Sequence, residues 1–268
     1  MKNFFVIGNP IEHSKSPLVH NYWFAKYNIN SVYDKMQTTE KELNKIIDQI
    51  KSDDVDGINV TVPFKQNIIP YVDELSDIAR STNSVNTVYK KEGKIIGDNT
   101  DVFGFSQSLQ DMIGKKTLKS ACLIGSGGVA PSIIYALKNM GLEQIYLTNR
   151  TIEKAKALQE KFGPIVTLVP WLDLESSMSV DLLINATSLG LPGSSNLDLS
   201  FDKLNSSTIV YDVIYNPSET SFLKKAKEKN CITANGLMMF LYQAQKAFEI
   251  WTKKKPDISQ VLIKKIEL

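Results

Sequence analysis

The hydrophobic positions of the chain fall into short runs that alternate with longer amphipathic segments. Runs rich in β-branched and aromatic residues predict strands, and a three- to four-residue apolar spacing predicts helices. In the first half, strands are expected at residues 4–7, 32–36, 57–62 and 85–89, and helices at residues 17–27, 40–50 and 73–79. In the second half, strands are expected at residues 121–124, 145–148, 165–169, 182–185, 209–213 and 232–234. This alternation is typical of an α/β fold with parallel sheets.

Two features divide the pattern into two domains. A hairpin is expected near residue 92, and the polar segment 98–101 after it opens a long helix. Beyond Gly236, apolar residues recur at three- and four-residue spacing and predict a helix with one apolar stripe. The expected domains are an N-terminal α/β substrate domain of residues 1–101, completed by C-terminal helices in residues 237–268, and a Rossmann-type doubly wound parallel sheet in residues 102–236.

Composition narrows the kinds of partner. The 31 Lys and Arg nearly balance the 29 Asp and Glu, and no long block of like charge occurs, so we expect no nucleic-acid or membrane partner. The N-terminus lacks signal-peptide features, and Cys122 and Cys231 lie in apolar stretches, which favours a cytoplasmic location. With two histidines and no clustered cysteines, we expect no metal site.

A glycine-rich turn follows the first strand of the second domain. Residues 120–124 predict a strand, Gly125, Ser126, Gly127 and Gly128 a tight turn, and Val129 leads into a helix with a buried apolar face. In this context the pattern Gly-x-Gly-x-x-Ala predicts a dinucleotide site, because glycines let the backbone approach a pyrophosphate at a helix N-terminus. A purely structural turn is the alternative.

The next strand indicates which dinucleotide. Folds specific for NAD place an acid there to bind the ribose 2′-hydroxyl, whereas this chain has Asn149, Arg150 and Thr151, followed by Lys154. Arg150 can pair with a 2′-phosphate, and its neighbours add donors, so NADP is the expected cofactor. Alternatively, Arg150 and Thr151 only cap and flank the next helix.

The first domain carries a second group of polar residues. The two-residue period of a strand puts Asn59 and Thr61 on one face and Val60 and Val62 on the other. Lys65 would project just past the carboxyl end of this strand, the edge at which open parallel sheets bind ligands.

Three further polar residues have two interpretations each. Ser16 is equally suited to cap the helix that follows and to contact a ligand. Asn86 is expected on a strand, as a site residue or as a turn or edge residue. Asp101 lies at the domain boundary, as a site residue or as a helix cap.

Taken together, these motifs resemble the shikimate dehydrogenase family, from residue 5 to the last helices. The resemblance rests on Ser-Lys-Ser-Pro at 14–17, Asn-Val-Thr-Val-Pro-Phe-Lys at 59–65, Val-Asn-Thr at 85–87, Gly-Asp-Asn-Thr-Asp at 97–101, Asn-Arg-Thr at 149–151, Asn-Ala-Thr-Ser at 185–188, Tyr-Asn-Pro at 215–217, and Gln243. It implies an NADP-dependent oxidoreductase of the shikimate pathway, which supplies aromatic amino acids, with 3-dehydroshikimate and shikimate as its substrates.

The resemblance also implies residue roles. Lys65 and Asp101 would flank the reacting hydroxyl, with the sequence leaving open which of them carries the proton. The residues implied to bind the substrate are Ser14, Ser16 and Tyr215 at the carboxylate, Thr61, Asn86 and Gln243 at the ring hydroxyls, and Asn59 beside them. Val213 and Gly236 would lie near the nicotinamide. Arg150 is assigned to the cofactor and Arg80 lies outside every motif, so hydroxyl donors suit the carboxylate.

Two departures from the family pattern and three alternatives remain. Val129 stands where alanine is usual, and Ala244 where glycine is common, which bears on cofactor and substrate affinity. The alternatives are an NAD-linked enzyme that also oxidises quinate, a catalytically silent dinucleotide-sensing regulator, and another two-domain reductase such as a folate-linked dehydrogenase. Arg150 disfavours the first, the presence of Lys65 and Asp101 the second, and the motifs at 14–17 and 185–188 the third. The oligomeric state is open, with a homodimer as one alternative.

Overall fold

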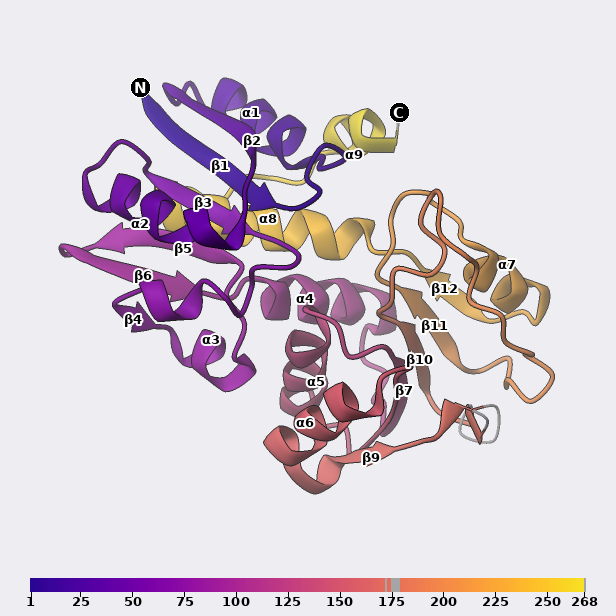
Figure 1. The fold of residues 1–268 in the computed structure, drawn as a ribbon. Helices are drawn as coiled ribbons and strands as arrows, with labels where there is room; N and C mark the ends of the chain where they lie inside the picture. The colour runs from indigo at the N-terminus through magenta and orange to yellow at the C-terminus, as the bar shows by residue number, and fades with distance from the viewer. Residues whose placement is uncertain (172, 175–178, 268) are drawn as a thin grey trace. The chain divides into compact units, whose positions relative to one another are not determined.

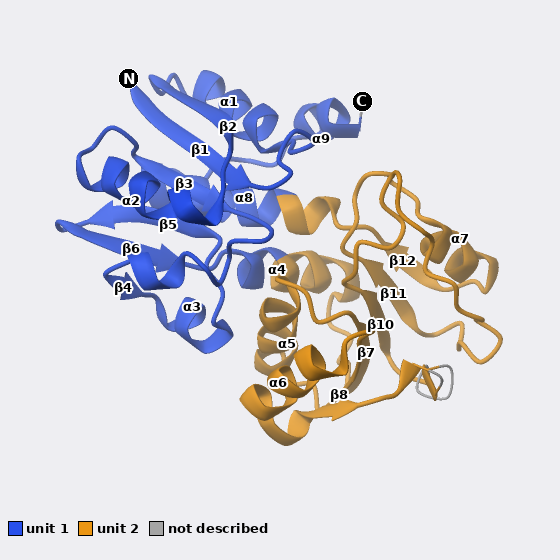
Figure 2. Ribbon diagram, viewed as in Figure 1, with its two compact units in different colours: residues 1–104, 241–268 blue, residues 105–240 orange. Residues whose placement is uncertain are grey.

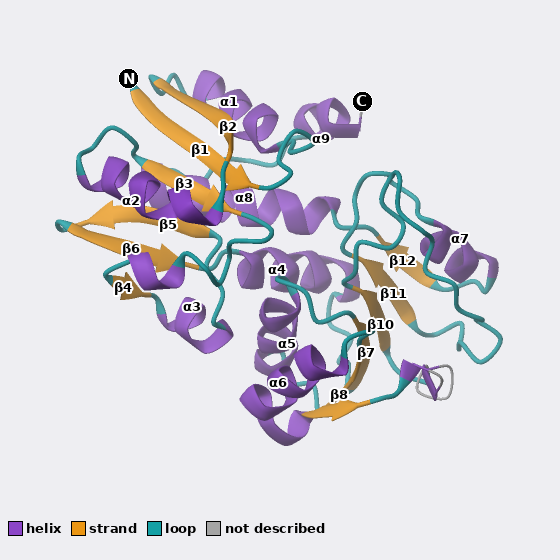
Figure 3. Cartoon of the chain, in the orientation of Figure 1, coloured by secondary structure: helices purple, strands orange, loops and turns teal. Residues whose placement is uncertain are grey.

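The structure, a computed structural model, describes residues 1–171, 173–174 and 179–267, and it confirms the predicted α/β class (Figure 3). Figure 2 shows two compact units, one formed by residues 1–104 and 241–268 and the other by residues 105–240. The boundaries fall inside helices α4 (Asp101–Ile113) and α8 (Leu237–Thr252), slightly later than predicted. Each of these helices therefore contributes to both units.

The first unit contains a mixed six-stranded sheet in the order β2-β1-β3-β5-β6-β4 (Figure 1). Its strands are β1 (Lys2–Gly8), β2 (Ser31–Gln37), β3 (Gly57–Val60), β4 (Glu74–Leu75), β5 (Thr87–Lys91) and β6 (Lys94–Asp98). Strand β5 runs antiparallel to both β3 and β6, so the prediction of a parallel sheet is wrong here. The reason is a two-residue hairpin at Glu92 and Gly93, whose φ angles of 52° and 78° suit a tight turn between antiparallel strands.

Helices cover both faces of this sheet. They are α1 (Ser16–Lys26), α2 (Leu43–Lys51), α3 (Asp77–Thr82), the unit 1 part of α8, and α9 (Gln260–Glu267), with short 3₁₀ turns at Glu40–Glu42 and Ile69–Tyr71. The apolar side of α2 packs against Ile58 and Val60 of β3. On the other face, Phe4 stacks between Phe24 of α1 and Trp251 of α8.

Three predicted elements of this unit differ in the structure. The helix expected at 73–79 is instead strand β4 followed by α3, because the Ser76 hydroxyl accepts a hydrogen bond from Ala79 N–H and starts the helix there. The strand expected at 85–89 begins at Thr87, so Asn86 precedes it. Strand β3 ends at Val60, where a turn closed by Phe64 N–H and the Thr61 carbonyl begins.

This early turn changes the expected faces. Val60 is 2% exposed, whereas Val62 is 58% exposed. The two valines therefore do not share a face, because the strand period no longer applies once the chain turns. Thr61 and Lys65 lie in the segment that leaves the strand.

The second unit contains a fully parallel six-stranded sheet in the order β12-β11-β10-β7-β8-β9. Its strands are β7 (Ser120–Ile124), β8 (Gln144–Thr148), β9 (Val166–Leu168), β10 (Leu182–Asn185), β11 (Ile209–Asp212) and β12 (Ile232–Ala234). All six strands were predicted, and their order is that of a dinucleotide-binding doubly wound sheet. The direction of winding reverses between β7 and β10, which makes the carboxyl ends of these two strands the expected ligand position.

Helices also cover both faces of the second sheet. They are the unit 2 part of α4, α5 (Ala130–Asn139), α6 (Ile152–Phe162) and α7 (Ser221–Glu228), with a 3₁₀ turn at Gly163–Ile165. Phe105 of α4 meets Tyr211 edge to face, with ring centroids 5.3 Å apart. On the other face, Phe222 and Leu223 of α7 pack in a buried cluster with Cys122 of β7. The central strands β7, β10 and β11 are thus buried on both sides, as expected in a parallel sheet, whereas the edge strands β9 and β12 are partly exposed.

Candidate functional site

Lys65 and Asp101 form a buried ion pair in the first unit. Lys65 lies in the turn after β3, where its carbonyl accepts a hydrogen bond from Val85 N–H (2.8 Å), and Asp101 is the first residue of α4. Lys65 Nζ lies 2.5 Å from Asp101 Oδ2, and the two side chains are only 12% and 8% exposed. The pair holds a proton donor against a proton acceptor, which is the arrangement that acid–base catalysis needs.

Asn86 holds Asp101 in place. Its Nδ2 donates to Asp101 Oδ1 (2.9 Å), and its Oδ1 accepts from Thr100 N–H (2.7 Å). Asn86 directly precedes β5 and is 3% exposed, so it lies outside the strand with its side chain buried in this network. The N-terminus of α4 is capped instead by Asn99, whose Oδ1 accepts from Val102 N–H (3.2 Å). The Asp101 carboxylate is thereby left to Lys65 and Asn86.

Two other predicted residues of the first unit come from different segments. Gln243, in the unit 1 part of α8, places Oε1 3.5 Å from Asn86 Nδ2. Thr61 is half-buried in the turn after β3. Its methyl group lies so close to Gly8 that a Cβ at that glycine would come within 2.6 Å of it. Gly8 therefore lets the chain after β1 pass next to Thr61.

Ser14 and Ser16 lie at the beginning of α1. The N-cap of this helix is Lys15, so the interpretation of Ser16 as the cap is wrong. The Ser14 hydroxyl accepts a hydrogen bond from Ser16 N–H (3.3 Å), which satisfies one backbone donor of the first turn. Ser16 is 7% exposed, so its side chain is buried at the beginning of the helix.

Asn59 is surrounded by hydrogen bonds on β3. Its Oδ1 accepts from the Tyr33 hydroxyl (2.7 Å), and its Nδ2 donates to the Asn86 carbonyl and to Thr87 Oγ1, both at 3.0 Å. One lone pair of Oδ1 remains for a further donor. Tyr33 was not predicted from the sequence, where it is one of ten tyrosines and belongs to no motif.

The glycine-rich turn of the second unit joins β7 to α5. Gly125 has a φ of 107°, and a Cβ there would meet the Thr187 methyl at 2.8 Å and the Ala186 backbone at 3.0 Å, so only glycine fits. At Gly127 a Cβ would meet nothing within 4 Å. Val129 occupies the N-cap position of α5, and its side chain makes no capping hydrogen bond. A turn with open space before an uncapped helix N-terminus suits a pyrophosphate.

Asn149 connects this turn to the next one. Its Oδ1 accepts from Ser126 N–H (3.1 Å), and its Nδ2 donates to the Thr151 carbonyl (2.7 Å). Arg150, Thr151 and Lys154 are exposed. Thr151 occupies the N-cap position of α6, but its side chain makes no capping hydrogen bond, which contradicts the alternative that it serves as a cap.

The remaining predicted residues lie in the segments after β11 and β12. A Cβ at Gly236 would lie 2.0 Å from the Val213 carbonyl oxygen, and Gly236 N–H donates to the Ile214 carbonyl (3.0 Å), so the two segments are in close backbone contact. The Tyr215 ring stacks on Phe240, with centroids 4.8 Å apart and planes 12° from parallel. Both residues belong to the second unit.

A buried network that the sequence did not predict fixes this loop. Asp212, at the end of β11, accepts hydrogen bonds from Thr220 Oγ1 (2.6 Å), Ile214 N–H (3.0 Å) and Asn185 Nδ2 (3.1 Å). Burial raises the pKa of Asp212, and these hydrogen bonds partly oppose the rise. The position of Asp212, an acid at the end of an apolar strand, was the sequence signal that could have indicated this network. Asn185, the first residue of the motif at 185–188, is one of its hydrogen-bond partners.

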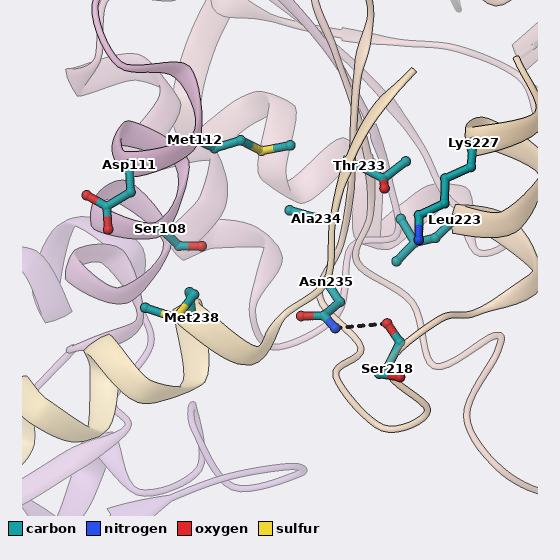
Figure 4. A pocket seen from close by; sticks show the side chains of 10 residues that line it. All are labelled: Ser108, Asp111, Met112, Ser218, Leu223, Lys227, Thr233, Ala234, Asn235 and Met238. Atoms are coloured by element: carbon teal, nitrogen blue, oxygen red, sulfur yellow. Dashed lines mark hydrogen bonds between the residues drawn. The ribbon is translucent and has the colours of Figure 1, made fainter. Parts of the chain in front are cut away.

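A cavity of about 430 Å³ lies in the second unit, beside α4, α7 and β12, and Figure 4 shows the side chains that line it. Its lining residues are Ser108, Asp111, Met112, Ser218, Leu223, Lys227, Thr233, Ala234, Asn235 and Met238. The Asn235 amide donates to the Ser218 carbonyl (2.8 Å) across one side of it. None of the predicted site residues lines this cavity.

Other chemistry finds little support in the part of the chain that the structure describes. No group of three or more His, Cys, Asp or Glu is placed to hold a metal ion. Within the same residues, no helix has the length and apolarity to cross a bilayer. Cys122 and Cys231 are buried and unpaired, and burial raises the pKa of the Cys122 thiol to about 12. That thiol is therefore unreactive near neutral pH.

Models of three protein families match consecutive parts of the chain. Residues 6–88 match the substrate binding domain of shikimate dehydrogenase, residues 107–210 match shikimate / quinate 5-dehydrogenase, and residues 236–262 match the C-terminal domain of shikimate 5′-dehydrogenase.

Individual relatives agree with these matches. The shikimate dehydrogenase (NADP(+)) of Pelagibacter ubique is 47% identical over 267 residues, covering 100% of this chain and 99% of that one. Among solved structures, the Thermus thermophilus enzyme in complex with NADP(H) and shikimate has a TM-score of 0.89 at 32% identity, covering 100% of this chain and 98% of that one. The quinate dehydrogenase of Corynebacterium glutamicum in complex with NAD has a TM-score of 0.92 at 28% identity, covering 100% and 99%.

Proposed function

The chain belongs to the shikimate dehydrogenase family, and on that basis we propose that it catalyses the reversible, NADPH-dependent reduction of 3-dehydroshikimate to shikimate. The observation that carries this proposal is the buried contact between Lys65 and Asp101. Lys65 lies inside the segment 6–88 that matches the family's substrate-binding domain. A paired ammonium and carboxylate with little exposure are what the interconversion of an alcohol and a ketone requires.

Each predicted site residue of the first unit has a role in the proposed reaction. Lys65 and Asp101 exchange the proton of the reacting hydroxyl, and Asn86 fixes the direction of the Asp101 carboxylate. Thr61 and Gln243 bind ring hydroxyls together with Asn86, and the free lone pair on Asn59 Oδ1 accepts a hydrogen bond from one of them.

The substrate carboxylate is bound by hydroxyl groups rather than by a guanidinium. Ser14, Ser16 and Tyr215 are the proposed donors. The scarcity of arginine supports this assignment, because Arg80 instead donates to the Leu75 carbonyl. The specificity of such a site comes from geometry, because three hydroxyl donors must point at the same carboxylate.

The second unit suits NADP. When bound, the nicotinamide supplies or accepts the hydride. The open space at Gly127 and the uncapped N-terminus of α5 accept the pyrophosphate. Exposed Arg150, with Thr151 and Lys154, pairs with the 2′-phosphate, which a carboxylate at this place would repel. Val213 and Gly236 form the backbone contact beside the nicotinamide.

Two further parts of the proposal concern the whole protein. We place it in the cytoplasm, where two buried, unpaired cysteines stay reduced. A homodimer is the second part, and light scattering on the purified protein tests it by giving the molar mass in solution.

A two-by-two assay tests the proposed reaction. Purified protein is mixed with shikimate or quinate and with NADP or NAD, and the absorbance of the reduced nicotinamide is followed. We expect the largest kcat/KM with shikimate and NADP. Absence of reduction in all four mixtures would contradict the reaction. Preference for quinate with NAD, which the C. glutamicum neighbour is named for, would contradict the role given to Arg150.

A further inference from the structure

Tyr33 is a buried tyrosine whose hydroxyl contacts a proposed substrate residue. It lies on β2 and is 1% exposed. Its hydroxyl donates to Asn59 Oδ1 (2.7 Å). Burial raises the pKa of the phenol well above its usual value. The phenol therefore stays protonated and remains a donor.

The ring of Tyr33 has little freedom to move. It stacks on the imidazole of His20 with centroids 4.3 Å apart and planes 7° from parallel. His20 is itself buried, and in the described residues neither of its ring nitrogens has a hydrogen-bond partner. Burial lowers the His20 pKa to about 3, so the imidazole is neutral and does not repel or bind the phenol through charge. The stack thus aims the hydroxyl in one direction.

From Tyr33 a continuous series of hydrogen bonds reaches the catalytic pair. Asn59 Nδ2 donates to Thr87 Oγ1 (3.0 Å), and the Thr87 hydroxyl donates to Asn86 Oδ1 (3.0 Å). Asn86 Nδ2 then donates to Asp101 Oδ1 (2.9 Å). Every member of this series belongs to the first unit, and the members other than the catalytic pair are 7% exposed or less.

We propose that Tyr33 is a positioning residue that aims the Asn59 side-chain amide at the substrate. This inference rests on the proposed function of the site. Phenylalanine would fill the same space, and burying a hydroxyl is unfavourable unless polar partners satisfy it. Here the hydroxyl donates to Asn59, a proposed substrate residue, so its contribution is directed at the site. A tyrosine that served the core alone would affect stability without affecting substrate affinity.

The test is Tyr33→Phe, which keeps the ring stacked on His20 and removes only the hydroxyl. We expect the KM for shikimate to rise about tenfold, the change that corresponds to one lost hydrogen bond, with kcat within about threefold and the KM for NADP unchanged. KM does not depend on how much of the sample is folded, so partial loss of stability leaves this measurement valid. An unchanged shikimate KM would overturn the proposal.

Tyr22→Phe is the matched control. It also removes a phenol hydroxyl from a hydrogen bond of the first unit, the 3.1 Å contact with Ser259, but that bond lies outside the series. We expect wild-type KM values for both substrates. If wild type and Tyr22→Phe are inactive with shikimate, the proposed function fails. If both are active and Tyr33→Phe matches them, only the role of Tyr33 fails.

A double-variant cycle separates positioning from a general structural effect. Once Asn59→Ala has removed the group that Tyr33 aims, adding Tyr33→Phe should raise the shikimate KM by less than about threefold, against about tenfold in the wild-type background. Equal factors in the two backgrounds would overturn the proposal, because independent effects multiply.

Discussion

Lys65 forms its ion pair with Asp101 where both side chains are largely shielded from water, at 12% and 8% exposure. This makes the ion pair sensitive to changes at either end, since loss of one partner leaves the other charge buried. The same isolation suits proton transfer, because water does not compete for the two groups. The proposed proton transfer therefore depends on the few side chains that contact Lys65 and Asp101.

Lys65→Ala tests the proton transfer directly. We expect kcat to fall by a factor of about 10² to 10⁴, the usual contribution of a positioned acid or base, while shikimate still binds through the serines, Thr61 and Gln243. Steady-state kinetics gives kcat, and calorimetric titration gives the affinity for shikimate. Lys90→Ala is the control, because Lys90 also pairs with an aspartate in the first unit, Asp53, but near the surface. Near-normal turnover in Lys65→Ala would remove Lys65 from the chemistry.

Arg150→Ala tests the choice of cofactor, and Arg80→Ala is its natural control because the chain has no other arginine. Loss of a charge-assisted contact to the 2′-phosphate should raise the dissociation constant for NADP by about 10- to 100-fold and leave that for NAD unchanged. Quenching of tryptophan fluorescence by each dinucleotide measures both constants. Equal weakening of NADP and NAD would show that Arg150 does not recognise the phosphate.

Elements differ in how far their sequence predicts them. The central strands of the second sheet are buried on both faces, and a short apolar run in the sequence predicted each of the six strands. The first sheet mixes directions, and there the two-residue period misled: β3 ends two residues before the apolar pattern does, and Val62 is exposed. Likewise, a helix was predicted from residue 73, but Ser76 is the N-cap and the helix begins only after it. Turns of this kind depend on single hydrogen bonds that periodicity does not register.

Contacts between distant elements were harder still. The pairing of Lys65 with Asp101 followed from a family resemblance, and motif spacing alone would not have found it. Tyr33 and Asp212 belong to no motif that carries a role, and each acts through partners that the fold brings together. The N-cap interpretation of Ser16 was wrong because the helix begins at Ser16 itself and Lys15 takes the N-cap position.

The turn between β7 and α5 gives a prediction at the scale of an element, because two of its glycines serve different purposes. Gly125→Ala should lower the free energy of unfolding by about 1–3 kcal/mol, since its φ is unsuited to a side chain and its Cβ would strike the Ala186 backbone. Gly127→Ala should change stability by no more than about 0.5 kcal/mol, because its Cβ would enter open space.

NADP affinity should not follow stability in these two variants. A methyl group at Gly127 occupies the space where the backbone approaches the pyrophosphate, and we expect affinity to fall about tenfold. Thermal denaturation with and without NADP measures both quantities on each variant. If Gly127→Ala binds NADP like the wild type, the pyrophosphate does not approach the turn at that residue.

At the scale of the whole molecule, the two units are stabilised by different cores, and the first has an unusual one. Its helices α1 and α8 meet the sheet through an aromatic cluster that contains a histidine. Phe4, Tyr33, Phe248 and Trp251 have ring centroids 4.3 to 6.2 Å from one another or from His20. Two of the three tryptophans of the chain, Trp23 and Trp251, belong to this region, so their fluorescence reports the unfolding of the first unit.

His20 should make the stability of this unit depend on pH. Burial lowers its pKa to about 3, whereas a histidine in the unfolded chain titrates near its ordinary pKa of 6.5. Between these values the unfolded chain binds a proton that the folded chain does not, so acid favours unfolding. The contribution is complete above pH 6.5 and is lost progressively as the pH falls toward 3. Its slope approaches about 1.4 kcal/mol per pH unit.

His20→Phe keeps an aromatic ring against Tyr33 and removes the titration. Denaturant unfolding, followed by tryptophan fluorescence between pH 4 and pH 6.5, should show the wild type losing stability relative to this variant as the pH falls. Val19→Ala is the control, because Val19 is a buried neighbour on the same helix without a titrating group. It should be less stable than the wild type by a constant amount. If the His20→Phe difference is also constant, the imidazole binds its proton equally well in the folded chain, and the aromatic cluster must admit a charge.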